Sequence, residues 1–188
     1  KSAMAAWIAR EDDEQPIDLV IANAGIGISH RDGLALGEVA ERIFAVNVEG
    51  VFNTVHPAIE RMTPRKRGQI AVVSSLAGYQ GLASAPAYSA SKSAVKAYAE
   101  GLRGHLAPLG LEVSAICPGF VESRLTARND FSMPFLMAGD AAARLIARKL
   151  ARNKGRISFP LPLLAAVRVM SLLPMGLIDL MARRLPKK

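Results

Sequence analysis

Short apolar segments alternate with longer segments of helical periodicity along this chain of 188 residues. Strands are predicted where apolar segments end at small or polar residues, at 17–22, 69–74, 111–116 and 156–159. Amphipathic helices are predicted where apolar residues recur at helical spacing, at 38–63, 87–107 and 139–152. A leading helix is expected at 1–10, and Pro57 is expected to kink or break the helix that contains it.

The alternation of strands and helices predicts an α/β fold, a doubly wound parallel sheet covered on both faces. In such sheets, ligands bind beyond the carboxyl ends of the strands. This rule selects residues 23–27, 74–81 and 118–123, which carry the small and polar side chains that a ligand-facing loop needs. We expect these three loops to meet in space.

Tyr88 and Lys92 are the centre of the candidate chemistry. They stand four positions apart in a predicted helix, so their side chains share one face. A fixed cation one turn away is expected to lower the tyrosine pKa, which would make Tyr88 a general acid or base at neutral pH. The spacing alone is also typical of exposed helix pairs. Ser75 ends a buried strand, where its hydroxyl can hold a substrate oxygen, and Asn47 stands inside a helix, where asparagine is mildly unfavourable.

Taken together, these residues and their neighbours resemble the short-chain dehydrogenase/reductase family. The resemblance is carried by Asn23-Ala24-Gly25 after a strand, Asn47 within VNVEG, Ser74-Ser75 after a strand, Tyr88-x-x-x-Lys92, and Pro118-Gly119 after the next strand. These motifs follow the family's order and spacing from residue 1 to about residue 160. The resemblance implies hydride transfer between a hydroxyl and a carbonyl, with NAD or NADP as the cofactor.

The resemblance also implies roles for single residues. Tyr88 is the proton donor or acceptor, Lys92 lowers its pKa and holds the nicotinamide ribose, and Ser75 orients the substrate oxygen. Asn47 supports a water-linked proton relay to Lys92. The implied cofactor-binding residues are Asn23, Ala24, Gly25, Tyr88, Lys92, Pro118, Gly119, Val121 and Ser123. Family members usually have threonine at the position of Ser123, and the serine hydroxyl is expected to keep its role.

The sequence departs from the family at its amino end. The family's first strand, its Gly-rich turn of the form TGxxxGxG and the helix that follows bind the cofactor pyrophosphate, and they are absent from the 188 residues. Gly25-Ile26-Gly27 does not replace them. We therefore expect a Rossmann-like sheet without its first strand–helix units, in a chain cut at its amino end. Such a fragment is expected to bind NADH or NADPH weakly or not at all.

The segment 125–137 occupies the position of the family's substrate lid. Its apolar residues are Phe131, Met133, Phe135, Leu136 and Met137. As a lid, they favour an apolar substrate such as a lipid-like or bulky ketone or alcohol. The alternative is that they pack on the core or in a dimer interface, and the sequence leaves both open.

Charge is divided unevenly along the chain. Residues 1–123 hold 11 basic and 13 acidic residues, whereas residues 124–188 hold 13 basic and 3 acidic residues, which together give the net +8. The basic part is interleaved with apolar residues rather than with the aromatic platforms that nucleic-acid binding needs, so no nucleic-acid partner is predicted. The single cysteine is typical of a reducing compartment, and we expect a cytoplasmic protein.

We interpret residues 1–160 as a partial Rossmann-type catalytic domain and residues 161–188 as a basic, amphipathic, helical extension. The extension could lie on a membrane surface or cover a partner subunit, or its Lys and Arg side chains could simply be solvated. The prediction is an oxidoreductase that works as a homodimer or homotetramer without a metal. The alternative is a non-catalytic, truncated module of the same fold that acts through dimer or membrane-surface contacts.

Overall fold

The computed structural model describes residues 1–27, 33–128 and 131–178. The tail beyond residue 178, with its terminal Arg and Lys residues, lies outside this description. Within the described ranges, four strands form one parallel sheet in chain order: β1 (Leu19–Ala22), β2 (Gly68–Val73), β3 (Leu111–Pro118) and β4 (Arg156–Phe159). The α-helices are α1 (Ser2–Glu14), α2 (Leu36–Phe44), α3 (Gly50–Met62), α4 (Pro86–Leu106), α5 (Gly139–Leu150) and α6 (Leu161–Leu172).

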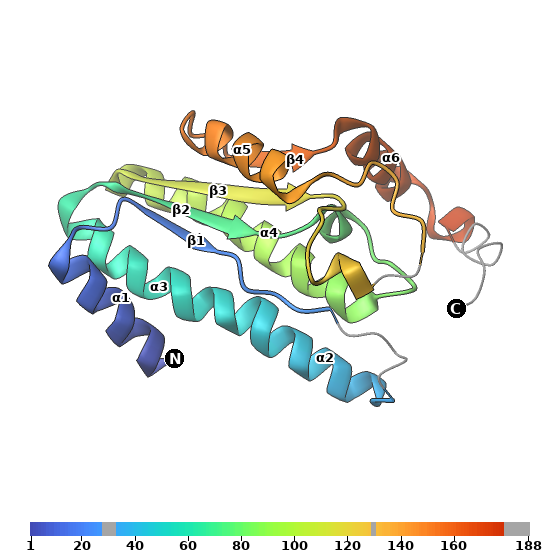
Figure 1. Cartoon of the computed structure of the whole chain (residues 1–188), viewed down its shortest axis with the longest axis horizontal. Coiled ribbons are helices and arrows are strands. Elements are labelled where there is room, and N and C mark those ends of the chain that lie inside the picture. The colour runs from blue at the N-terminus through green and yellow to red at the C-terminus, as the bar shows by residue number, and fades with distance from the viewer. Residues whose placement is uncertain (28–32, 129–130, 179–188) are drawn as a thin grey trace.

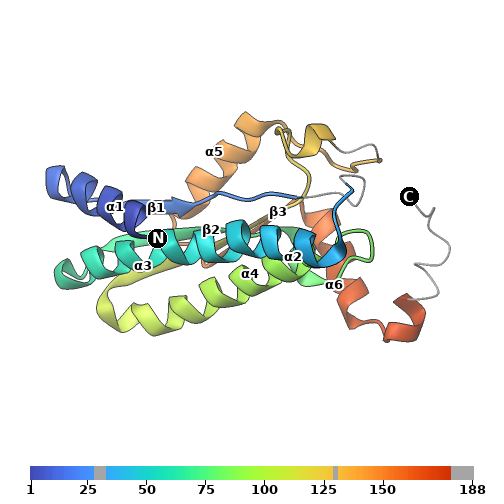
Figure 2. The same cartoon turned by 90° about the horizontal axis from the view of Figure 1, so that it is seen from below.

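Helices cover both faces of the sheet, with α5 on the opposite side from α3 and α4 (Figure 1 and Figure 2). Alternate strand residues point to opposite faces. On one face Val72 and Val113 belong to the main core with α3 and α4, and on the other Ala71 and Ile116 pack against α5. The predicted doubly wound parallel sheet is therefore confirmed.

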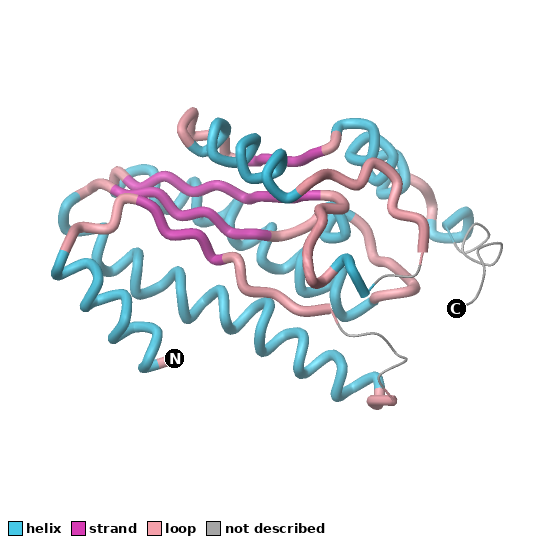
Figure 3. The backbone as a smooth tube through the Cα atoms, viewed as in Figure 1, coloured by secondary structure: helices cyan, strands magenta, loops and turns pink. Residues whose placement is uncertain are grey.

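All strands run in the same direction, so their carboxyl ends lie along one edge of the sheet. The loops 23–27, 74–81 and 118–123 follow β1, β2 and β3 at this edge, as Figure 3 shows. The edge that the sequence selects for ligand binding is thus built from three loops that are far apart in the sequence.

The helical region 38–63 departs from regular α-helix before Pro57 and not at the proline, where the break is predicted. α2 and α3 are joined by a wider, π-helical turn, η2 (Ala45–Glu49), whereas α3 runs through Pro57 without a break. Four residues of α3 are buried before and after the proline, namely Val51, Val55, Ala58 and Met62. This packing on both sides holds the helix together, and the prediction of a break at Pro57 is wrong.

α1 is held against the rest of the chain by one buried carboxylate. Asp12 accepts hydrogen bonds from Arg61 at 2.9 Å and from Arg65 at 2.9 Å, and a further one from the backbone N–H of Ile17. These contacts tie α1 to the end of α3 and to the chain that enters β1. They confirm the expected leading helix and explain its place beside α3.

α6 has an inner and an outer face. Leu163, Leu164 and Val167 pack against the main core. Leu161, Val169 and Leu172 share the outer face and are 71%, 60% and 84% exposed. In the described part of the chain, no helix is long and apolar enough to cross a membrane.

Candidate active site

The three loops meet around Lys92. A Cβ atom placed on Gly25 would lie 3.1 Å from the Lys92 Nζ and 3.4 Å from the Asn47 Oδ1, so the loop after β1 lies directly against both side chains. The loop after β2 meets the end of β3, where the Ser75 Oγ lies 3.4 Å from the carbonyl oxygen of Pro118. The structure thus brings together the candidate residues of α4, the π-helical turn and all three loops.

Ser75 is positioned by the short helix η4 (Leu76–Tyr79), which begins directly after it. Its Oγ accepts a hydrogen bond from the backbone N–H of Ala77 at 3.1 Å and so caps η4. A Cβ on Gly78 would lie 2.8 Å from the backbone carbon and oxygen of Lys92. Only glycine permits this close approach between η4 and α4. Ser74, the residue before Ser75, also ties this segment to α4, because its Oγ donates a hydrogen bond to the Lys92 carbonyl at 2.6 Å.

Tyr88 lies in the first turn of α4. Burial raises the pKa of Tyr88, and the nearby Ser75 side chain acts in the opposite direction. The Lys92 Nζ lies 5.9 Å from the centre of the tyrosine ring. The pair therefore shares one helix face as predicted, but in this structure the pKa of Tyr88 is not lowered.

Lys92 is almost completely buried, with an exposure of 4%, and its Nζ donates to the carbonyl oxygen of Val73 at 3.0 Å. Burial lowers the pKa of Lys92 to about 8. An ammonium group has three N–H donors, so Lys92 can bind a further acceptor besides Val73.

Asn47 is fully buried within the π-helical turn. Its Oδ1 accepts from the Ile26 N–H at 2.8 Å, and its Nδ2 donates to the Ile26 carbonyl and to the Ser91 Oγ, both at 3.0 Å. The Asn47 side chain thus both accepts from and donates to the backbone of Ile26, in the loop after β1. Its bond to Ser91 fixes that loop to α4. Sequence reasoning did not single out Ser91 or Ile26, although Ser91 stands next to Lys92 in the same motif.

The remaining candidate residues line the same edge. Asn23, Ala24 and Gly25 are exposed, Gly119 donates from its backbone to Phe159 at 2.7 Å, and Val121 forms a bridge to Met137. The Ser123 Oγ lies 3.2 Å from the Thr126 Oγ1, so its hydroxyl has a partner within its own loop. An exposed backbone at 23–25 beside a buried ammonium group fits a nucleotide cofactor, because phosphate and ribose oxygens need such donors.

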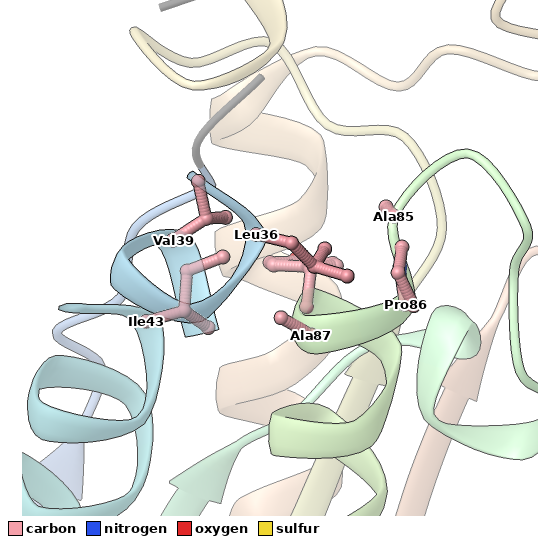
Figure 4. Close-up of a pocket in the computed structure, with 7 residues that line it drawn as sticks. Leu36, Val39, Ile43, Ala85, Pro86 and Ala87 are labelled. Carbon is pink, nitrogen blue, oxygen red and sulfur yellow. The ribbon is translucent and has the colours of Figure 1, made fainter. Parts of the chain in front are cut away.

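An apolar pocket lies beside Tyr88. Leu36, Val39 and Ile43 of α2 face the start of α4, where the other side is formed by Ala85, Pro86 and Ala87 (Figure 4). Tyr88 completes the lining. The catalytic candidate therefore stands at the wall of a small pocket that is lined mainly by apolar side chains.

The segment predicted as a lid also reaches this region. A Cβ on Gly27 would lie 3.3 Å from the Leu125 Cδ1 and 3.8 Å from the Tyr88 ring. Phe131 contacts Phe120 edge to face with 5.9 Å between ring centres. Residues 129 and 130 of the segment lie outside the described ranges.

Comparison with known proteins agrees with this geometry. Residues 2–132 match the family model of the short chain dehydrogenases. The chain is 43% identical over 169 residues to an uncharacterized oxidoreductase of Myxococcus xanthus, covering 90% of this chain and 67% of that protein. It is 35% identical over 134 residues to the probable oxidoreductase EphD of Mycobacterium bovis, of which it covers 23%. The chain thus spans about two thirds of the first relative and about a quarter of the second.

Solved structures share the fold. A short-chain dehydrogenase of Streptomyces avermitilis superposes with a TM-score of 0.77 at 18% identity, over 99% of this chain and 77% of that one. A short-chain dehydrogenase of Sphingobium yanoikuyae, solved in complex with NADPH, gives a TM-score of 0.74 at 22% identity, over 98% of this chain and 72% of that one.

Proposed function

Because this chain belongs to the short-chain dehydrogenase family, we propose that the whole protein is an NAD- or NADP-dependent oxidoreductase that interconverts a hydroxyl and a carbonyl group. The observation that carries the proposal is the placement of Tyr88 beside Ser75 at the ligand edge, with the Lys92 ammonium 5.9 Å from the centre of the Tyr88 ring. The bound dinucleotide supplies or accepts the hydride.

The proton chemistry is assigned to side chains of this chain. In the direction of reduction, the Tyr88 hydroxyl donates its proton to the carbonyl oxygen of the substrate, and in oxidation the phenolate accepts it back. The Ser75 hydroxyl donates a hydrogen bond to the same oxygen. The raised pKa of Tyr88 keeps its proton in place before reaction, and the Lys92 cation stabilises the phenolate that forms.

The cofactor would be held by the three loops. Backbone and side-chain groups of Asn23, Ala24, Gly25, Pro118, Gly119, Val121 and Ser123 line the edge, and the spare donors of Lys92 suit the ribose hydroxyls. Asn47 supports this arrangement by fixing Ile26. The water-linked relay from Asn47 to Lys92 stays a prediction.

The substrate is proposed to be apolar next to its reacting carbon. The support is the mainly apolar lining of the small pocket beside Tyr88 and the position of Leu125 against Gly27, which also lies beside the Tyr88 ring. We expect the full-length protein, with any residues encoded upstream of Lys1, to reduce long-chain or bulky ketones with higher kcat/KM than short polar ketones. One methylene buried against apolar side chains changes binding by about 0.8 kcal/mol, so several carbons that pack on the apolar residues around Tyr88 give a difference of about tenfold or more. A preference for the short polar set would contradict the apolar substrate and leave the reaction class standing.

A membrane contact is proposed for the outer face of α6. Leu161, Val169 and Leu172 form an exposed apolar stripe there, while Leu163 and Val167 on the inner face hold the helix to the core. Because the inner face belongs to the core, point changes test this contact better than deletion of the helix. Changing the three exposed residues to serine is expected to lower co-sedimentation with anionic vesicles about tenfold or more. Equal binding by both forms would remove the membrane contact and favour a homodimer or homotetramer that covers this face.

The alternative of a non-catalytic module predicts no turnover with any ketone. The satisfied hydrogen bonds of Asn47 and the Ser75–Tyr88 contact favour the enzyme. Measured turnover in the full-length protein separates the two.

A further inference from the structure

Tyr79 stands where four elements meet. It ends η4, which begins directly after Ser75, and its hydroxyl lies 2.8 Å from the Ser158 Oγ in β4. Among the described residues, three cations lie near its ring: the Lys96 Nζ at 5.0 Å, the Arg156 Cζ at 6.0 Å and the Arg168 Cζ at 5.9 Å from the ring centre. They come from α4, β4 and α6, so one side chain connects the loop after Ser75 to three other elements.

The cations are held together by one carboxylate and by the ring. Glu100 forms ion pairs with Lys96 at 3.5 Å and with Arg156 at 2.6 Å. Cations beside the face of an aromatic ring are attracted by the negative electrostatic potential of that face. The cation of Arg168 lies on α6, at the boundary between the inner and outer faces of that helix. The cation–π contact between the Tyr79 ring and Arg168 therefore holds α6 against the loop after β2.

α6 also presses on the third ligand-facing loop. A Cβ on Gly119 would lie 2.9 Å from the Leu163 Cδ2 and 3.0 Å from the Pro160 Cδ. The same Cβ on Gly119 would lie 3.4 Å from the Leu76 Cδ1 in η4. Leu163 thus sits behind both the Pro118–Gly119 loop and the short helix that positions Ser75. The family model ends before α6, at residue 132, so this contact is not part of the matched region.

We propose that α6, fixed through Tyr79 and Arg168, positions Ser75 and Gly119 for the reaction, and that Tyr79 is a positioning residue. This inference rests on the proposed function. The Tyr79 hydroxyl is directed to Ser158 on β4, and the role assigned to Tyr79 needs no contact with the substrate. It acts through η4, whose first residue follows Ser75. A shift of about 1 Å at a group that orients the substrate can cost about 10² in rate, so a loose η4 lowers kcat more than it weakens cofactor binding.

The experiment compares Tyr79→Leu, Tyr79→Phe, Arg168→Ala and Arg168→Lys in the full-length protein. Steady-state kcat and KM with a ketone and NADPH or NADH are measured beside the urea unfolding midpoint. Tyr79→Leu is expected to lower kcat about tenfold or more, with the cofactor KM within about twofold. Tyr79→Phe keeps the ring and is expected to retain most of the kcat that Tyr79→Leu loses. Arg168→Lys keeps the charge and is expected to retain most of the kcat that Arg168→Ala loses. Arg148→Ala, an exposed arginine of α5 on the opposite face of the sheet, is the matched control and is expected to leave kcat unchanged.

The coupling of the two residues gives a second readout. The double variant Tyr79→Leu/Arg168→Ala is expected to lose less kcat than the product of the single losses, because both remove the same contact. A lower unfolding midpoint with unchanged kcat in Tyr79→Leu would mean a purely structural contact and would overturn the inference. Turnover in the wild type with equal kcat in all variants overturns this inference alone, whereas a wild type without turnover overturns the proposed function as well.

Discussion

Replacing Tyr88 by phenylalanine is expected to lower turnover of the full-length protein by about 10²–10⁴-fold, because the change removes the proton that the substrate oxygen receives. The ring stays in place between the apolar pocket and Gly27, so the fold is expected to be kept. The variant is compared with the wild type by steady-state kinetics with NADH and NADPH, and by circular dichroism for the fold.

Tyr98→Phe is the matched control for this change. Tyr98 lies on the same helix, but its hydroxyl is bonded to the His56 Nε2 at 2.6 Å, away from the ligand edge. Its loss is expected to change kcat by less than about threefold, as for a group outside the site. A Tyr88→Phe protein that keeps more than about a tenth of wild-type kcat would contradict the proton role of Tyr88.

Replacing Asn47 by alanine is expected to lower the free energy of unfolding by about 2–4 kcal/mol. The change leaves the N–H and the carbonyl of Ile26 without the side chain that pairs with both, and an unpaired buried polar group costs about 1–3 kcal/mol. The measurement is urea unfolding of the chain, followed by its circular dichroism. We also expect lower turnover in the full-length protein, because the loop that follows β1 is no longer fixed to α4.

Two further variants sharpen this prediction. Asn47→Asp keeps an acceptor for the Ile26 N–H, but its buried carboxylate would face the Ile26 carbonyl and cannot donate to it, so a loss at least as large as for alanine is expected. Asn53→Ala changes a half-buried asparagine of α3 and is expected to cost less than about 1 kcal/mol. If Asn47→Ala unfolds at the same urea concentration as Asn53→Ala, the anchoring role assigned to Asn47 is wrong.

The strands and most helices could be predicted from the sequence because their signals are local. The apolar segments 69–74 and 111–116 became β2 and β3, and the Pro–Leu–Gly at 108–110 that ends the helix closes with Gly110 at a φ of 75°, a conformation typical of a helix stop. The alternation of strands and helices also predicted that the three candidate loops share one edge of the sheet. Such features depend on residues that are neighbours in the chain.

What the sequence could not show depends on residues that meet only in the fold. The π-helical turn at 45–49 has the same apolar spacing as the helices around it, so periodicity does not reveal it. The hydrogen bonds between Asn47 and Ile26 join residues 21 positions apart in the chain, and the contact between Tyr79 and Ser158 joins residues 79 positions apart. Burial of Tyr88, which raises its pKa where the helix spacing predicts a lowering, is likewise a property of the packed sheet and α4.

The most direct test of the proposed reaction is to follow the hydrogen itself. The full-length protein is incubated with a bulky apolar ketone and NADPH or NADH that carries deuterium on the reactive nicotinamide carbon, and the product is analysed by mass spectrometry. The account predicts an alcohol with deuterium on its carbinol carbon from the wild type, and almost none from Tyr88→Phe in the same time. Bound cofactor without transfer of deuterium to any ketone of the panel, or equal transfer by both proteins, would contradict it.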